Sequence, residues 1–115
     1  MSDIDAATLK QWLSENGEVK LYDVRSQSEI QQGLIPGATW LPLHLIPLEV
    51  QRLTQEASAH RLVFYCQTGG RSAQASLFLA RLGCGPVYNL RHGMVGWLSA
   101  GGELKAAPAY QGLQS

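Results

Sequence analysis

The chain has 115 residues, 45% hydrophobic and 16% charged, a balance that is typical of one globular domain and excludes a disordered chain. Nine basic and nine acidic residues give a formal charge of zero, and without a Lys/Arg cluster we expect no nucleic-acid partner and no anionic membrane partner. The apolar runs are too short to span a membrane, and the acidic, polar N-terminus differs from a secretory signal, so we expect a cytoplasmic protein.

Short β-prone segments alternate with helical patterns along the chain. In chain order they are a helix over 5–15, a strand over 19–24, a helical turn over 26–33, a strand over 38–43, a helix beginning at residue 47, a strand over 61–66, a helix over 71–82, a strand over 86–90 and a short helix over 93–101. This alternation indicates an α/β fold with a parallel sheet covered by helices. We expect a single domain over 1–103 and a loosely attached C-terminal tail over 104–115.

Local signals support the first helix and the third strand. Asp5 is a suitable N-cap for the first helix, whose buried face carries Leu9, Trp12 and Leu13. The run 61–66 reads RLVFYC and is almost wholly apolar. Such a run predicts a central strand that is buried on both faces.

Cys66 ends this central strand and is followed by the loop QTGG. Open parallel sheets place their ligand sites at the carboxyl ends of the strands. Gly69 and Gly70 can both adopt positive φ angles, which would let successive backbone N–H groups point at one spot. The helix that starts near Arg71 adds its own free N–H groups and partial positive charge. We therefore expect a cradle that favours the Cys66 thiolate, with a pKa below the usual value of about 8.5.

The alternative interpretation of this segment is an ordinary buried cysteine at the end of a strand, with the glycines forming a turn. The glycine pair, the arginine and the helix start occur together, and this combination favours the reactive thiol. Cys66 and Cys84 are too few and too far apart for a zinc cluster or a CxxC redox pair, so we expect free thiols, no protein-bound metal and no cofactor. Cys84 lacks an anion-binding context and is predicted to take no part in the chemistry.

Three motifs and the N-terminal helix resemble the rhodanese family, the single-domain sulfurtransferases. The stretch CQTGGRSAQA resembles the active-site loop of that family. The stretch LYDVRSQSEIQQGLIPGA resembles its segment with D-V-R, a glutamate and then G-H-I-P-G-A. The stretch VYNLRHGMVGW resembles its closing motif V-x-x-L-x-G-G-x-x-x-W. The resemblance covers about residues 3–101. It implies a rhodanese-like three-layer fold, with a twisted parallel five-stranded sheet and helices on both faces.

The resemblance also implies a mechanism. The Cys66 thiolate attacks the sulfane sulfur of thiosulfate or a similar small anion, keeps it as a persulfide, and passes it to cyanide, a thiol or a protein cysteine. Cys66 and Arg71 are the implied catalytic residues, and Arg71 helps to bind the donor. The N–H groups that stabilise the persulfide belong to the implied substrate-binding loop, Gln67, Thr68, Gly69, Gly70 and Ser72. The Ser72 hydroxyl either donates to this loop or only starts the helix.

Two positions depart from the family pattern. Leu34 stands where histidine is common, and His92 replaces the first glycine of the G-G pair, where we expect a solvated side chain. The charged residues after the first predicted strand are expected to be structural. Asp23 would accept hydrogen bonds from nearby loop N–H groups, and Arg25 would pair with Glu29, four residues later.

Other functions remain open alternatives from the sequence alone. Cysteine-dependent phosphatases and arsenate reductases use the same thiolate, N–H cradle and arginine, but with five residues between cysteine and arginine. Here four residues separate Cys66 from Arg71, and no aspartate is obviously placed as the acid for a leaving group. A non-catalytic rhodanese-like binding or regulatory module is disfavoured by the intact cysteine loop. A persulfide carrier that serves another protein's cysteine is compatible with every motif.

Overall fold

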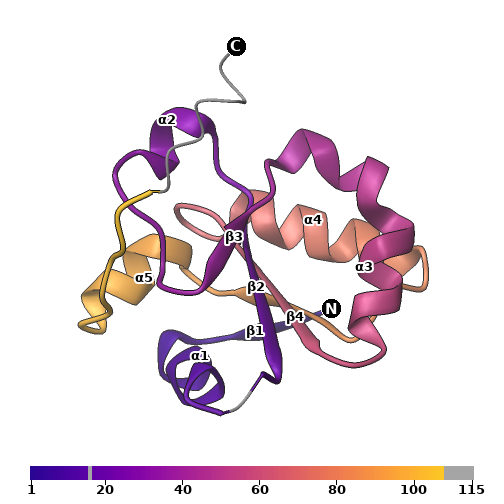
Figure 1. Ribbon diagram of the computed structural model, residues 1–115, viewed down its shortest axis with the longest axis horizontal. Helices are drawn as coiled ribbons and strands as arrows, with labels where there is room; N and C mark the ends of the chain where they lie inside the picture. The colour runs from indigo at the N-terminus through magenta and orange to yellow at the C-terminus, as the bar shows by residue number, and fades with distance from the viewer. Residues whose placement is uncertain (16, 108–115) are drawn as a thin grey trace.

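The computed structural model describes residues 1–15 and 17–107 and contains a five-stranded parallel sheet between two layers of helices (Figure 1). The strand order is β1-β5-β4-β2-β3, and every neighbouring pair is parallel. This arrangement confirms the expected α/β fold class. The strands are β1 (Ser2–Ile4), β2 (Val19–Asp23), β3 (Ala38–Trp40), β4 (Arg61–Tyr65) and β5 (Val87–Leu90).

Strand β1 has no counterpart among the strands predicted from the local sequence pattern. It pairs with β5 in the register Ser2 to Tyr88 and Ile4 to Leu90. Ile4 is its one buried residue, and three residues are too few to show an alternating pattern. Its strand conformation is therefore dictated by pairing with β5 rather than by its own residues.

Helices cover both faces of the sheet (Figure 1). On one face lie α1 (Ala6–Leu13) and α5 (Gly93–Ser99), and on the opposite face lie α3 (Val50–Ala57) and α4 (Gly70–Arg81). A short helix, α2 (Gln27–Ile30), follows β2. The N-cap of α1 is Asp5, as predicted, because its carboxylate accepts a hydrogen bond from the Thr8 N–H at 2.8 Å.

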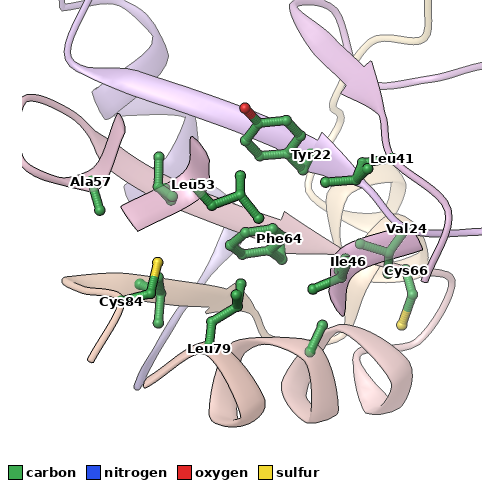
Figure 2. Close-up of a cluster of buried hydrophobic side chains, with 13 residues drawn as sticks. Tyr22, Val24, Leu41, Ile46, Leu53, Ala57, Phe64, Cys66, Leu79 and Cys84 are labelled. Atoms are coloured by element: carbon green, nitrogen blue, oxygen red, sulfur yellow. The ribbon is translucent and has the colours of Figure 1, made fainter. Parts of the chain in front are cut away.

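The hydrophobic core consists of two clusters that share strand β4. Leu62 and Phe64 point to the face of α3 and α4, while Val63 and Tyr65 point to the face of α1 and α5. All four side chains are fully buried, which confirms the prediction of a strand buried on both faces. Figure 2 shows the first cluster, with the Phe64 ring near its centre, between Tyr22 and Leu53 on one side and Leu79 on the other.

The segment around Pro47 differs from the prediction. Instead of an α-helix that begins there, a 3₁₀ segment, η1 (Leu43–Glu49), contains Pro47, and α3 begins at Val50. Proline has no N–H to donate to the carbonyl four residues before it, so the preceding turns cannot form a regular α-helix through this position.

Hydrogen bonds join the segment around the predicted boundary at residue 103 to the rest of the domain. Lys105 and Leu34 exchange two backbone hydrogen bonds, of 2.8 and 2.9 Å, and the Glu103 carbonyl accepts the Trp97 indole N–H at 2.7 Å. Residues 108–115 of the tail lie outside the described residues, and the boundary at residue 103 stays a prediction. Within 1–15 and 17–107, none of the helices has the length and apolarity needed to cross a membrane.

Candidate active site

Cys66 directly follows β4, at the carboxyl end of the sheet, and its side chain is buried. Its Sγ accepts a hydrogen bond from the Gly69 N–H at 3.1 Å. Gly69 has a φ of +109°, and a Cβ at this position would lie 3.1 Å from the His92 nitrogen, so the loop needs glycine here. Gly70, in contrast, does not adopt a positive φ and is the first residue of α4.

The Cys66 thiol is activated by its hydrogen bonds. Burial alone would raise its pKa, but hydrogen bonds from the Ser72 hydroxyl and from the N–H groups of Ser72, Gly69 and Thr68 together lower that pKa below its ordinary value. The direction agrees with the sequence-based expectation. A lowered pKa increases the thiolate fraction at neutral pH, and the thiolate is the nucleophilic form of cysteine.

Ser72 lies on the first turn of α4 and faces the cysteine. Its Oγ is 3.4 Å from the Cys66 Sγ and only 2.5 Å from the Asn89 Oδ1 on β5, and its side chain is fully buried. The Ser72 hydroxyl therefore lies between the cysteine sulfur and the side chain of Asn89.

The N-terminus of α5 holds the back of the same loop. The Met94 N–H donates to the Cys66 carbonyl at 2.9 Å, and the Val95 N–H donates to the Gln67 carbonyl at 3.1 Å. Gly93 permits this close approach, since a Cβ there would lie 2.3 Å from the Cys66 carbonyl oxygen, and its φ is +50°. These hydrogen bonds from α5 to the cysteine loop were not predicted from the sequence. The pair His92-Gly93 in the closing motif was the signal that could have indicated them.

Arg71 is held by Glu29 from α2. Its guanidinium makes two hydrogen bonds to the Glu29 carboxylate, of 2.7 and 2.8 Å. The Arg71 hydrogen bonds, opposed by partial burial, lower the pKa of Glu29 to about 2. The expected pairing of Glu29 with Arg25 is wrong, because α2 turns the Glu29 side chain toward the cysteine loop.

Arg25 is instead paired with Asp23, and both side chains are buried. Their two parallel hydrogen bonds, Nε to Oδ1 at 3.0 Å and Nη2 to Oδ2 at 2.8 Å, form a bidentate pair. The Asp23 carboxylate also accepts the Arg25 N–H at 2.9 Å, as expected for a loop-binding aspartate. Arg25 Nη1 donates to the Gln67 Oε1 at 3.0 Å, so this buried pair fixes one side of the loop that follows Cys66.

The family model of the rhodanese-like domain matches residues 5–100. The chain belongs to the rhodanese-like domain family. It is 40% identical over 101 residues to a sulfurtransferase of Allochromatium vinosum, a match that covers 88% of this chain and 92% of the relative. It is 35% identical over 82 residues to the human thiosulfate:glutathione sulfurtransferase, covering 62% of this chain and 71% of the relative. The solved structure of a rhodanese-like domain protein from Staphylococcus aureus superposes with a TM-score of 0.77 at 30% identity, over 92% of this chain and 100% of the other.

Other residues singled out in this rhodanese-like domain lie around the rim of the site or away from it. Thr68 and His92 are exposed, and His92 adopts a φ of +66° at the N-cap of α5. Leu34 is buried, so an apolar contact stands where the family commonly has histidine. Cys84 is a free, buried thiol whose pKa is raised by burial, and it lies at the opposite end of the core cluster from Cys66 (Figure 2). This separation leaves Cys84 too far away to act as a partner for Cys66.

Proposed function

We propose that this domain is a sulfurtransferase that carries a sulfane sulfur on Cys66 as a persulfide. The observation that carries the proposal is the environment of the Cys66 Sγ, a buried sulfur at the carboxyl end of β4 that accepts the Gly69 N–H and faces the Ser72 hydroxyl. Membership of a family whose relatives include sulfurtransferases supports the same reaction class.

The reaction has two half-reactions with thiosulfate as donor. The Cys66 thiolate attacks the outer sulfur of thiosulfate, a new S–S bond forms, and the old S–S bond breaks so that sulfite leaves with its electron pair. Cys66 then carries a persulfide anion. The acceptor, cyanide or a thiolate, attacks the outer sulfur, and thiocyanate or a new persulfide leaves as the Cys66 thiolate is regenerated.

The hydrogen-bond donors of the loop suit a negative charge on sulfur in both states. The thiolate and the terminal persulfide sulfur are both anions. The Gly69 N–H already donates to the Cys66 Sγ, and the Ser72 hydroxyl lies 3.4 Å from the same sulfur. Gln67, Thr68 and Gly70 complete the loop around the sulfur. We assign these residues, with Cys66, Arg71 and Ser72, to the reaction site.

Arg71 supplies the positive charge that an anionic donor requires. Its side chain is 39% exposed, while Cys66 is 1% exposed, so the donor meets Arg71 on its way to the sulfur. The buried sulfur favours a small donor, and the name of the human relative makes thiosulfate and glutathione the first donor and acceptor to test. Both cysteines are free thiols, in keeping with the reducing cytoplasm that we propose as its location.

The test is the formation of thiocyanate from thiosulfate and cyanide by the purified protein. Initial rates at several fixed cyanide concentrations should give parallel double-reciprocal lines, as a two-step transfer requires. Cys66→Ser should abolish the activity, while Cys84→Ser, the matched control, should retain it. Full activity of Cys66→Ser would overturn the proposal.

A further inference from the structure

Asn89 is a buried polar residue beside the cysteine loop that the proposed reaction does not use. It lies on β5, its side chain is 3% exposed, and it links the first turn of α4 to the edge strand β1. Its Oδ1 is 2.5 Å from the Ser72 Oγ, and its Nδ2 donates to the Asp3 Oδ1 at 3.1 Å. A chain of hydrogen-bonding groups therefore runs from Asp3 through Asn89 and Ser72 to the Cys66 sulfur.

The direction of each hydrogen bond in this chain follows from chemistry. An ionised carboxylate only accepts hydrogen bonds, so Asp3 fixes the amide of Asn89 with its NH₂ group toward β1. The amide oxygen must then face Ser72. Because that oxygen also only accepts, the Ser72 hydroxyl must donate its proton to Asn89.

Ser72 has one hydroxyl proton and three acceptors near it. The Asn89 Oδ1 is at 2.5 Å, the Gly69 carbonyl oxygen at 3.3 Å and the Cys66 Sγ at 3.4 Å. A hydroxyl can donate to one of them at a time, and the shortest contact is to the amide. The proton that could stabilise a sulfur anion is thus held by Asn89.

We propose that Asn89 is a positioning residue that sets the direction of the Ser72 hydroxyl and so limits how strongly Ser72 stabilises the anionic sulfur of Cys66. The consequence of this arrangement for sulfur transfer rests on the proposed function, whereas its effect on the Cys66 thiolate does not. When negative charge develops on the sulfur, the Ser72 hydroxyl must turn from Asn89 to the sulfur. The charged groups that the structure places around this arrangement are Asp3 on β1, Arg71 on α4 and its partner Glu29 on α2.

The test is a titration of Cys66 in a Cys84→Ala background, where Cys66 is the single thiol. The rate of alkylation by iodoacetamide is measured against pH, and it reports the thiolate fraction without any sulfur donor. Asn89→Leu keeps the branched shape and the number of side-chain heavy atoms but removes the acceptor, so it should lower the apparent pKa of Cys66 by about 0.5 to 1 pH unit. In a Ser72→Ala background the same substitution should have no effect, because there is no hydroxyl to redirect.

An unchanged titration in Asn89→Leu, or the same shift with and without the Ser72 hydroxyl, would overturn the proposal. Asp3→Asn is a second variant at an exposed position, which frees the Asn89 amide to turn its NH₂ group toward Ser72. It should shift the titration in the same direction as Asn89→Leu, and more strongly when Ser72 is present than when it is alanine. These outcomes are independent of thiosulfate, so a failure of the proposed function would leave the titration result intact.

Discussion

The guanidinium of Arg71 and the carboxylate of Glu29 form a two-bond ion pair, with distances of 2.7 and 2.8 Å, that joins the first turn of α4 to α2. Glu29 also occupies the N3 position of a capping box with Ser26, whose N–H donates to the same carboxylate at 3.0 Å. The carboxylate is therefore fixed from two sides. The positive charge of Arg71 is therefore partly neutralised by Glu29.

Substituting Glu29 by Gln should strengthen donor binding. Without the carboxylate, the Arg71 charge is free for thiosulfate, and we expect KM for thiosulfate to fall by about two- to fivefold, which is the energy range of a partly exposed ion pair. Steady-state thiocyanate formation measures this change. Glu49→Gln removes an ion pair to Arg52 elsewhere on the surface and is the matched control, with KM unchanged. A higher KM in Glu29→Gln would instead mean that Glu29 is needed to hold Arg71 in place.

The same ion pair predicts how stability depends on pH. The pKa of Glu29 lies at about 2 in the folded protein, below its ordinary value of 4.5, chiefly because of Arg71. Its stabilisation is therefore fully present above pH 4.5 and is lost as the pH falls toward 2. Urea unfolding at a series of pH values should show a stability gap between the wild type and Glu29→Gln that narrows over this range. A gap of constant size would contradict the assignment.

Gly93→Ala should disrupt the hydrogen bonds from the N-terminus of α5 to the carbonyl groups of Cys66 and Gln67. The new Cβ would lie 2.3 Å from the Cys66 carbonyl oxygen, on a backbone with a φ of +50°. We expect a loss of about 3 kcal/mol in the free energy of unfolding, combining overpacking with left-handed strain. Gly101→Ala, at a φ of +80° with no atom within 4 Å of the new Cβ, carries only the strain and should lose about 1 kcal/mol. Equal losses in the two variants would show that the close approach has no energetic weight.

Arg25→Met should destabilise the domain strongly. It leaves the buried Asp23 carboxylate without its partner and also removes the hydrogen bond to Gln67, so we expect a loss of about 3–5 kcal/mol in chemical denaturation. The double variant Asp23→Asn, Arg25→Met removes the uncompensated charge and should lose less than the single variant. If the double variant loses as much free energy of unfolding as the single variant, the packing of the Arg25 side chain rather than its charge explains why Arg25 is required.

The parts of this fold that could be predicted from sequence are those with strong local or motif signals. The apolar run of β4, the Asp5 cap and the placement of Cys66 before a helix depend on residues that are neighbours in the chain. Such features depend on the local pattern of apolar residues and on helix capping, and both of these act over a few neighbouring residues. The sequence also predicted the direction of the Cys66 pKa shift, since the loop N–H groups come from the same short segment.

The contacts that were missed or mistaken join segments that are distant in sequence. Arg25 and Glu29 have the spacing of a helical pair, but Arg25 lies before α2 begins, and Glu29 reaches Arg71, 42 residues later. Asn89 looked like one residue of an ordinary strand, and its role beside Ser72 depends on the pairing of β5 with a strand that has no signal of its own. Chain neighbours cannot reveal such contacts, because tertiary packing creates them.

The central claim is that Cys66 stores a sulfur atom, and intact-protein mass spectrometry after incubation with thiosulfate and removal of excess donor tests it most directly. We predict that the wild type gains the mass of one sulfur atom, that cyanide removes it, and that Cys66→Ser gains nothing while Cys84→Ser behaves like the wild type. A gain that persists in Cys66→Ser, or no gain in the wild type with thiosulfate or any other sulfane donor, would contradict the account.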